Sequence, residues 1–491
     1  MSKGNQGLGT WPRRRARISP DAEALTQGSR RLTYRQLADR VDRWASALQD
    51  LGITRGDRVA WLGANDIATF EAFFATGLLG AIFVPLNTRL AAVELRYLLD
   101  DCGASILITG AGVDHVVPEL GEHVPVSSIE LSTSLAEEPD VHLDEPALIL
   151  YTSGTTGKPK GAVLTHGNLT WNTFNQLVHF DLTESERALC IAPLFHAVGL
   201  GQITLPTLLK GGRVEVVTKF DAGTILRLID DESITSFSCV PTMLQLMTEH
   251  PAWAEADLSS LRHVIYGGST INESVAKEWL NRGVRILQGY GMTEASPGVY
   301  MAIHDGAAEH RTSMGVPHFF TDVAHRAEDG QAIGIEYGGP GRELLIRGPH
   351  VFAGYWSHPR DDDGWFRTGD VVRTGADGWS YVVDRVKDVI ISGGENISPA
   401  EVEAVLVDFD GVRSAAVVAA PDDRWGEVGV AFVELHPGVT VDVPALRRHL
   451  EANLARFKLP RDIHLVDELP RNATGKVLRA RLRDELNREA P

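Results

Sequence analysis

Residues 151–161 read YTSGTTGKPKG and follow the apolar run at residues 147–150, which predicts a buried strand that ends in a loop. Glycine permits backbone conformations and close approaches that other residues resist, so the backbone N–H groups and hydroxyls of this loop can converge on one anion. Lys158 and Lys160 add positive charge. We therefore expect the loop to bind a polyphosphate, through Thr152, Ser153, Gly154, Thr155, Thr156, Gly157 and Lys158.

This loop differs from the phosphate loop of nucleoside triphosphatases, GxxxxGK[ST], in which a hydroxyl after the lysine holds Mg²⁺. Here Gly154 and Gly157 are too close together, and Pro159 follows Lys158. A surface loop without a ligand is the alternative interpretation of this composition. The whole undecamer, however, resembles the phosphate loop of the adenylate-forming enzymes, which include acyl-CoA synthetases, luciferases and the adenylation domains of peptide synthetases.

Length and composition limit the class of protein. A chain of 491 residues predicts at least two domains. Its 43% hydrophobic and 23% charged residues are typical of a soluble globular protein. The net charge of −18 argues against a general nucleic-acid binder. We expect no signal peptide and no transmembrane segment, and therefore a cytoplasmic protein.

The cysteines and the N-terminal arginines have ordinary interpretations. No CxxC motif occurs, and the three cysteines lie in apolar surroundings, which predicts core thiols in a reducing compartment; they are Cys102, Cys190 and Cys239. The arginine cluster at residues 13–17 predicts either a solvated helix face or a contact with acidic lipid.

Helical and strand-like stretches alternate through most of the chain. A capping box at Thr33 and Gln36 begins a helix that Gly52 ends. Helical patterns recur at residues 67–79, 91–99 and 226–229, between strand-like runs at residues 58–62, 81–84, 105–108, 236–240, 263–266 and 285–287. This alternation predicts parallel sheets covered by helices on both faces.

The pattern changes near residue 338. A turn at residues 338–341 and strands at 343–347 and 379–383 indicate a small β-rich module. Beyond it we expect helices at residues 399–406 and 443–454, strands at 415–419 and 430–435, and a last helix from Val477. We therefore predict an α/β protein. Its large N-terminal domain, residues 1–385, combines parallel α/β sheets with the β-rich module, and residues 386–491 form a small α+β domain that the resemblance makes mobile.

A second motif, QGYGMTE at residues 288–294, follows a strand-like run, and ligands of α/β proteins meet the carboxyl ends of strands. Tyr290 offers a flat face to a base, and Glu294 is a hard oxygen ligand suited to Mg²⁺. A turn without a ligand is the alternative. The resemblance implies an adenine and metal segment, with Thr152 helping Glu294 to hold Mg²⁺ and nucleotide contacts from Gly289, Tyr290, Gly291, Met292 and Thr293.

Further segments resemble the family's nucleotide contacts. Gly267, Gly268 and Ser269 end a strand and would form the adenine-side wall, although the family often has Gly-Gly-Ala here, followed by Pro. In WFRTGD, residues 365–370, a tight turn would place Asp370 to accept both ribose hydroxyl protons. DRVKD, residues 384–388, resembles the hinge motif, which implies that Arg385 meets ribose or phosphate and that the C-terminal domain rotates about Lys387.

The C-terminal domain carries two more matches. PRNATGK, residues 470–476, resembles the catalytic-lysine loop, in which a mobile ammonium would stabilise charge developing on the carboxylate and the α-phosphate; this is Lys476. SGGENI, residues 392–397, resembles the loop that forms the thioesterification tunnel, and DRWGE, residues 423–427, accompanies it. They imply CoA-side contacts from Gly393, Gly394 and Trp425.

PLFHAVG, residues 193–199, matches the segment whose aromatic residue lines the acyl pocket in acyl-CoA and aryl-CoA synthetases. The resemblance implies a pocket and catalytic role for His196, with a buried, hydrogen-bonded core histidine as the alternative. We expect Gly291 and Gly298 to leave room for the acyl group. On family grounds the pocket comprises His196, Val198, Tyr266, Gly291, Pro297 and Gly298. A dicarboxylic acid is less favoured, whereas medium or long aliphatic acids and aryl acids stay open.

The matches extend from Thr33 to Lys476, and the resemblance implies an ATP-dependent acid–thiol ligase, closest to the fatty-acyl-CoA synthetases. A carboxylate attacks the α-phosphorus of Mg·ATP, giving acyl-AMP and pyrophosphate, with Lys476 acting. The lid then rotates about Lys387, and the CoA thiol attacks the mixed anhydride.

Other functions stay open at this stage. An acyl-AMP ligase that delivers to a carrier protein or another nucleophile is the main alternative. A peptide-synthetase module would need an aspartate near His196, which residues 193–196 lack. Luciferase-like oxidation and a non-catalytic nucleotide-binding regulator are further alternatives. Association as a homodimer is also left open.

Overall fold

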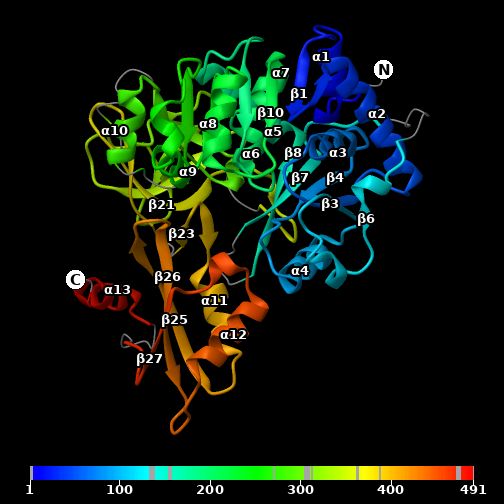
Figure 1. Cartoon of the computed structure of the whole chain (residues 1–491). Helices are drawn as coiled ribbons and strands as arrows, with labels where there is room; N and C mark the ends of the chain where they lie inside the picture. The colour runs from blue at the N-terminus through cyan, green and yellow to red at the C-terminus, as the bar shows by residue number, and fades with distance from the viewer. Residues whose placement is uncertain are drawn as a thin grey trace. The chain divides into compact units, whose positions relative to one another are not determined.

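The structure is a computed structural model that describes residues 4–131, 139–152, 158–268, 271, 273–303, 310, 313–360, 364–385, 389–470 and 477–489. The chain forms two compact units. Figure 1 traces it from the N-terminus in blue to the C-terminus in red. Unit 1 comprises Met1–Thr88, Leu99–Leu150 and Gly161–Val386, and unit 2 comprises Arg89–Leu98, Tyr151–Lys160 and Lys387–Pro491. The domain boundary between residues 385 and 386 stays a prediction, since unit 2 also takes two segments from earlier in the chain.

The first sheet of unit 1 carries two of the predicted nucleotide segments. Its strand order is β15 (Val316–Pro317), β14 (Gly298–Met301), β13 (Ile286–Gly291), β12 (His263–Tyr266), β11 (Ser236–Cys239), β9 (Arg187–Cys190), β10 (Arg213–Val216), β1 (Glu23–Gln27), β2 (Arg30–Thr33). The pairs from β13 through β1 are parallel, and β14, β15 and β2 join antiparallel at the edges. The helices between these strands are α5 (His166–His179), α6 (Ala197–Gly201), α7 (Thr204–Lys210), α8 (Ala222–Asp231), α9 (Pro241–Thr248) and α10 (Glu273–Asn281).

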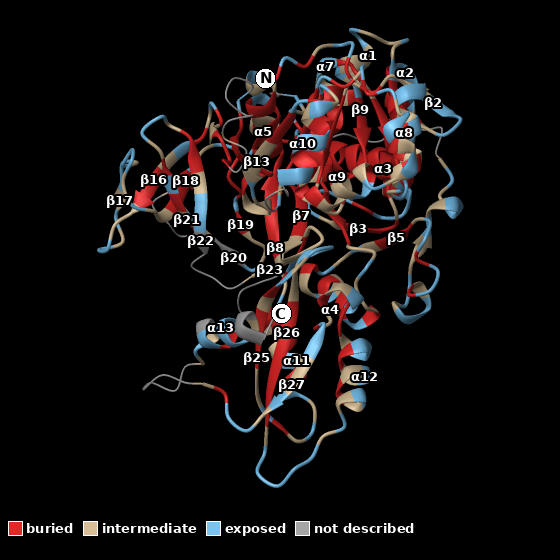
Figure 2. Cartoon of the chain, turned by 60° about the vertical axis from the view of Figure 1, so that its left-hand side comes forward, coloured by how far each residue is buried: buried red, intermediate tan, exposed pale blue. Residues whose placement is uncertain are grey.

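A second sheet has the order β20 (His358–Pro359), β19 (Gly354–Tyr355), β8 (Lys160–Thr165), β7 (Pro146–Thr152), β4 (Ile82–Pro85), β3 (Arg58–Leu62), β5 (Ile106–Thr109), β6 (Val124–Pro125). The helices along this part of the chain are α1 (Trp11–Ala16), α2 (Tyr34–Asp50), α3 (Ile67–Leu78) and α4 (Ala92–Cys102). The strands are apolar on both faces because helices cover them, and Figure 2 shows the resulting buried layers. The predicted parallel α/β architecture is confirmed.

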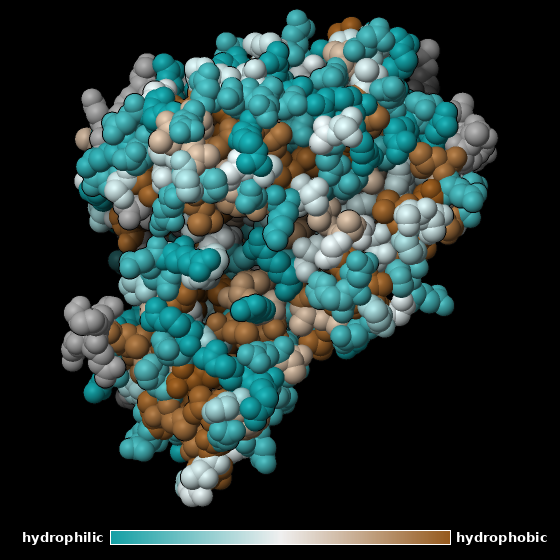
Figure 3. Space-filling model, viewed as in Figure 1, coloured by the Kyte–Doolittle hydropathy of each residue, from teal (hydrophilic) through white to brown (hydrophobic). Residues whose placement is uncertain are grey.

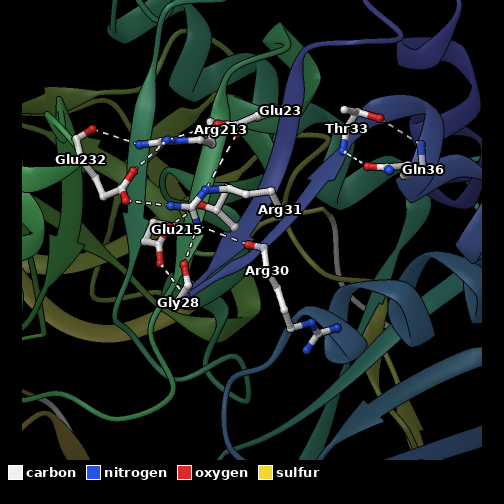
Figure 4. A network of polar contacts seen from close by, with 10 residues as sticks. Glu23, Gly28, Arg30, Arg31, Thr33, Gln36, Arg213, Glu215 and Glu232 are labelled. Carbon is white, nitrogen blue, oxygen red and sulfur yellow. Dashed lines mark hydrogen bonds and ion pairs between the residues drawn. The ribbon is translucent and has the colours of Figure 1, made fainter.

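Ion pairs as well as strand pairing attach the hairpin formed by β1 and β2 to the rest of the first sheet (Figure 4). Its capping box is present, since Thr33 accepts from the Gln36 backbone and the Gln36 side chain accepts from the Thr33 backbone. Arg31 and Arg213 both contact Glu232, at 2.8 and 2.9 Å. Glu215 on β10 is buried and accepts from the Gly28 backbone at 3.3 Å. Burial raises the pKa of Glu215 above its ordinary value, against the opposing effect of its hydrogen bonds and of Arg31.

The predicted β-rich module is an antiparallel sheet with the order β17 (Ala332–Ile333), β16 (Asp322–Arg326), β18 (Arg342–Arg347), β21 (Phe366–Thr374), β22 (Ser380–Arg385). Asp370 lies within strand β21, so the expected tight turn at this position is wrong. Gly369 has a φ of 78°, and the register with β18 shifts between Glu343 and Leu345. An irregular strand therefore directs the Asp370 side chain, rather than a turn.

The C-terminal part of unit 2 is an α+β fold, as predicted. Its sheet has the order β24 (Glu395–Ile397), β23 (Ile390–Ser392), β26 (Gly426–Leu435), β25 (Val412–Asp422), and β27 (Asp462–Val466) pairs with β26. Helices α11 (Pro399–Val407) and α12 (Val443–Asn453) pack a core that includes Val402, Leu406, Val433 and Leu450. The last helix, α13, spans Arg479–Glu489, so it begins two residues after the predicted Val477. Figure 3 shows apolar side chains on the surface of this unit.

Two other predictions can be compared with the structure. Cys102, Cys190 and Cys239 are buried thiols, and burial raises the pKa of Cys190 to about 12. Among the arginines of α1, Arg13 pairs with Asp42 at 2.5 Å. In the part of the chain that the structure describes, no helix has both the length and the apolar composition that crossing a bilayer requires.

Candidate active site

Tyr290 and Asp370 bring two of the predicted nucleotide motifs together. Tyr290 lies near the end of β13, and its hydroxyl donates a hydrogen bond to Asp370 Oδ2 at 2.7 Å. Asp370 is buried, and its backbone N–H donates to Thr368 Oγ1 at 3.1 Å. Arg385 pairs with Asp370 across β21 and β22 through the backbone. The ring face of Tyr290 could pack against a base, and the adjacent Asp370 carboxylate could accept ribose hydroxyls.

The two glycine segments also meet. Gly267 follows β12, and a Cβ on Gly267 would lie 2.9 Å from the backbone oxygen of Gly289. Gly268 has a φ of 88°, which glycine adopts without strain. Because β12 and β13 are parallel neighbours, both segments lie at the same sheet edge, as the sequence predicted. Ser269 lies outside the described residues.

Glu294 has a partner that the sequence analysis did not identify. It lies in the short helix Thr293–Ala295, and its Oε1 accepts a hydrogen bond from the Tyr355 hydroxyl at 2.7 Å. Tyr355 is on β19, which pairs with β8. Burial raises the pKa of Tyr355, and the adjacent Glu294 carboxylate raises it further, so the hydroxyl stays a donor. No local sequence pattern predicts this contact, because it depends on the pairing of β19, residues 354–355, with β8.

The donor chemistry fits Mg²⁺. The ion prefers hard oxygen ligands and usually takes one or two protein groups together with substrate phosphates. The Glu294 carboxylate of unit 1 is such a group, and so is the Thr152 hydroxyl of unit 2. Within the described ranges, no group of three or more His, Cys, Asp or Glu side chains is arranged to hold a metal.

The base of the phosphate loop is anchored within unit 2. Thr152 is the last residue of β7, and its hydroxyl contacts the Lys160 backbone oxygen at 3.5 Å. The Lys158 ammonium lies 5.7 Å from the centre of the Tyr97 ring, and the Tyr97 hydroxyl contacts the Pro159 oxygen at 3.5 Å. No local sequence pattern singles out Tyr97 on α4. Ser153, Gly154, Thr155, Thr156 and Gly157 lie outside the described residues.

The predicted acyl-pocket residues are distributed over α6 and the ends of β12, β13 and β14. His196 precedes α6, is half-buried, and its ring lies 4.8 Å from the Phe195 ring. Val198 is on α6. Tyr266 is buried at the end of β12 and donates to Gln288 Oε1 at 3.3 Å, and burial raises its pKa. Pro297 accepts a backbone hydrogen bond from Met292 at 3.0 Å.

The expectation that Gly291 and Gly298 leave room for the acyl group is wrong. A Cβ on Gly291 would collide with the backbone oxygen of Pro297. A Cβ on Gly298 would lie 2.6 Å from Gln176 Nε2 and 3.0 Å from His318 Nε2. Both positions are glycine because neighbouring groups already fill the space.

A buried polar layer behind Gly298 was missed by the sequence analysis. Asn172 Oδ1 accepts from the Gly298 backbone at 3.1 Å, and its Nδ2 donates to the Gly201 oxygen at 2.7 Å. Gln202 donates to Gln176 at 3.0 Å. Polar residues at helical spacing on α5 are the only sequence signal of this layer, and such spacing also fits a solvated face.

The predicted CoA-side residues lie together in unit 2. Gly393 and Gly394 connect β23 and β24 with φ values of 57° and 86°. The Gly393 backbone N–H donates to the Trp425 oxygen at 2.8 Å, and a Cβ on Gly393 would lie 2.8 Å from the Trp425 ring. The next residue, Glu395, pairs with Arg89 at 2.7 Å. Lys387 and Lys476 lie outside the described residues. For Arg385 the structure describes only the backbone.

Comparisons with known proteins identify the family to which the chain is similar. Family models match residues 12–356 as "AMP-binding enzyme" and residues 401–476 as "AMP-binding enzyme C-terminal domain". Feruloyl-CoA synthase from an Amycolatopsis species is 48% identical over 490 residues, covering 98% of this chain and 99% of that protein. Indoleacetate–CoA ligase from Aromatoleum aromaticum is 39% identical over 495 residues, covering 96% of each.

A solved structure matches along nearly the whole chain. It is a double mutant of o-succinylbenzoate-CoA synthetase from Bacillus subtilis bound with its product analogue OSB-NCoA, with a TM-score of 0.87, 32% identity, and coverage of 97% of this chain and 98% of that one. The chain therefore belongs to the AMP-binding enzyme family, in the adenylate-forming superfamily, and is an AMP-forming carboxylic acid–CoA ligase.

Proposed function

We propose that this ligase activates an aryl carboxylic acid, and that a hydroxycinnamic acid such as ferulic acid is the first substrate to test. The reaction uses ATP, Mg²⁺ and CoA. The observation that carries the substrate proposal is the 48% identity to feruloyl-CoA synthase across the full length of both chains. The relative named as an indoleacetate–CoA ligase supports the same class, since its named substrate is also an aromatic ring bearing a carboxylate side chain.

The nucleotide site is proposed to centre on the Tyr290–Asp370 hydrogen bond. Asp370 would accept both ribose hydroxyls, since a buried carboxylate is a strong acceptor. Tyr290 would present its ring to adenine while its hydroxyl holds the Asp370 side chain, at 2.7 Å. Gly267, Gly268 and Gly289 support this proposal, because the backbone can approach a flat base only where no side chain intervenes.

Glu294 is the proposed protein ligand to Mg²⁺, with Thr152 as its companion. The bound ion would neutralise phosphate charge as pyrophosphate leaves. Tyr355 would orient Glu294, because its hydroxyl occupies one carboxylate oxygen and directs the other. Lys158 and the loop at residues 153–157 would hold the phosphates.

The chemistry proceeds in two half-reactions. The substrate carboxylate attacks the α-phosphorus of ATP, and pyrophosphate departs with the electron pair of the broken P–O bond. Lys476 is proposed to stabilise charge on both reacting groups in this step. The CoA thiolate then attacks the acyl carbon and AMP leaves. We propose that this second step follows a rotation about Lys387 that brings Gly393, Gly394 and Trp425 to the CoA side.

The acyl group is proposed to lie against His196, Val198 and Tyr266. Tyr266 supports an aromatic substrate, because its ring is held by burial and by the hydrogen bond to Gln288. We place the substrate beside Pro297, Gly291 and Gly298. It does not occupy the Cβ positions of the two glycines, because neighbouring groups fill that space.

Two further expectations remain proposals. The buried thiols at positions 102, 190 and 239 are compatible with a reducing compartment such as the cytoplasm. Association into a homodimer is tested by analytical ultracentrifugation of the purified chain.

Pyrophosphate release with a panel of acids tests the function. Ferulic, cinnamic, indoleacetic and palmitic acids should each be assayed with and without CoA, and the products weighed by mass spectrometry. We expect feruloyl-AMP without CoA and feruloyl-CoA with it. A preference for palmitic acid would refute the substrate class, and the absence of any adenylate would refute the reaction.

A further inference from the structure

Lys458 is a buried cation that the proposed mechanism does not use. It is 5% exposed and ends the short helix Arg456–Lys458. Its Nζ lies 2.7 Å from Glu94 Oε1 and 2.8 Å from Glu401 Oε1. Both carboxylates are also buried. A buried ammonium between two carboxylates compensates charges that would otherwise be costly to remove from water.

The two carboxylates come from different parts of unit 2. Glu401 is in the first turn of α11, in the same C-terminal stretch as Lys458. Glu94 is on α4, 364 residues before Lys458, in the segment Arg89–Leu98. Lys458 therefore joins this early segment to the C-terminal chain. The other oxygen of Glu94 accepts from the Ala91 backbone at 2.7 Å, so the same side chain also caps the start of α4.

The segment at residues 89–98 contacts residues that flank the phosphate loop and a residue beside the CoA-side glycines. Tyr97 lies under Lys158, and the Tyr151 hydroxyl donates to the Leu98 oxygen at 3.2 Å, so the segment supports the phosphate loop. Arg89 pairs with Glu395, which directly follows Gly393 and Gly394. Contacts that hold this segment to the C-terminal chain therefore also support the Arg89–Glu395 pair beside the CoA-side loop.

We propose that Lys458 is a positioning residue for thioester formation, and that its bridge between Glu94 and Glu401 holds segment 89–98 to the C-terminal chain while CoA attacks. The inference rests on the proposed function, in which adenylation and thioester formation use different contacts of the C-terminal chain. Adenylation depends on Lys476 and does not need the bridge. Thioester formation needs Gly393 and Gly394 in place, and the bridge keeps them there.

The charge pattern provides a matched pair of variants. In Glu94→Gln, Lys458 keeps its ion pair with Glu401 but loses its ion pair to segment 89–98, which leaves the Arg89–Glu395 pair as the charged link that the structure describes between this segment and the C-terminal chain. In Glu401→Gln, the link survives as a neutral Lys458–Glu94 pair. The two substitutions are chemically identical, and the glutamine oxygen at position 94 can still cap α4. Only the position of the lost charge differs.

The two half-reactions should be measured separately, with an acid that the wild type adenylates. ATP–pyrophosphate exchange reports adenylation, and single-turnover transfer from enzyme-bound acyl-AMP to saturating CoA reports thioester formation. We expect Glu94→Gln to slow transfer by about tenfold while exchange changes by less than about twofold, because one buried charge contact is lost. Glu401→Gln should slow transfer by less than about threefold. Glu485→Gln, which breaks an exposed pair with Arg481, serves as a surface control and should change neither rate.

Two results would overturn the inference. Equal transfer rates in Glu94→Gln and wild type would show that the bridge does not act in this step. A Lys458→Met variant that only raises the KM for CoA, with normal transfer at saturation and no effect of Glu94→Gln, would make Lys458 a CoA contact instead.

Hydrogen exchange supplies a readout that does not depend on activity. Amides of residues 92–98 should exchange faster in Glu94→Gln than in Glu401→Gln, and those of β3 should not change. Unchanged exchange in residues 92–98 would refute the bridge even if no acid were adenylated. Failure of the wild type to form any adenylate would refute the proposed function alone.

Discussion

The hydroxyl of Tyr290 donates a 2.7 Å hydrogen bond to the buried carboxylate of Asp370, joining two motifs that lie 80 residues apart in the chain. Asp370→Asn should lower the rate of ATP–pyrophosphate exchange by about 100-fold, because an amide accepts ribose hydroxyls less strongly than a carboxylate does. Tyr290→Phe should cost about five- to tenfold, the value of one hydrogen bond. If Asp370→Asn had normal exchange and a normal KM for ATP, the ribose assignment would be wrong.

Tyr355→Phe tests the orientation of Glu294. Removing the hydroxyl frees the Glu294 oxygen that now accepts from it, so the carboxylate loses its fixed direction. We expect the Mg²⁺ concentration at half-maximal adenylation to rise about tenfold, in the range of supporting contacts around metal ligands, with a smaller effect at saturating Mg²⁺. Titration of the exchange rate with Mg²⁺ measures this. An unchanged titration curve would separate Tyr355 from metal binding.

Lys476→Ala should abolish adenylation but spare thioester formation from supplied acyl-AMP, because the ammonium acts only while charge develops on the carboxylate and the α-phosphate. Exchange and transfer assays on the same preparation distinguish the two steps. Normal pyrophosphate exchange in this variant would refute the assignment of Lys476.

Gly298→Ala tests the close packing behind the proposed acyl site. The new methyl group would lie 2.6 Å from Gln176 Nε2 and 3.0 Å from His318 Nε2, so the buried polar layer must shift. We expect the free energy of unfolding to fall by about 1–3 kcal/mol. Gly334→Ala is the matched control, since nothing lies within 4 Å of its Cβ position. Equal midpoints in urea for the two variants would contradict the packing argument.

Because His166 is buried, we expect the folded protein to lose stability in mild acid. It is fully buried, its Nδ1 accepts from the Leu8 backbone at 3.1 Å, and burial lowers its pKa from 6.5 to about 4, against a small opposing effect of Glu145. The unfolded chain therefore binds the extra proton first as pH falls below 6.5, so the stability present at neutral pH is lost between pH 6.5 and about 4. We expect this residue to contribute a loss of about 2 kcal/mol between pH 7.5 and pH 5.

His166→Gln provides the comparison, because the amide oxygen can still accept from Leu8 but does not titrate in this range. Urea unfolding at pH 7.5 and pH 5 should show a smaller pH-dependent loss in the variant than in the wild type. The same loss in both proteins would exclude His166 as the source.

Local chemistry made much of the fold predictable. The Thr33–Gln36 capping box and the apolar strand at residues 58–62 depend on neighbours within a few positions, and both form as expected. The glycines at positions 267 and 289 were singled out by their resemblance to the family's nucleotide segments, because a glycine at a strand end by itself also fits a turn without a ligand. The last helix was less predictable, since helix ends depend on contacts outside the helix.

Long-range contacts account for what the sequence analysis missed. Tyr355 reaches Glu294 because β19 pairs with β8, a pairing that no local pattern specifies. The expected free space at Gly291 and Gly298 was wrong for the same reason, since Pro297, Gln176 and His318 fill it only after the chain has folded.

The amino-acid sequence by itself determined the α/β alternation, because alternation follows from side-chain periodicity. Its short motifs resembled those of the adenylate-forming enzymes, and that resemblance implied the class of reaction. Only the tertiary structure decided which distant groups meet: the hydroxyl of Tyr290 with Asp370, that of Tyr355 with Glu294, and the ammonium of Lys458 with Glu94. Those contacts arise where strand order and helix packing bring remote residues together, and hydrogen bonds and ion pairs act only over the few ångströms that folding provides.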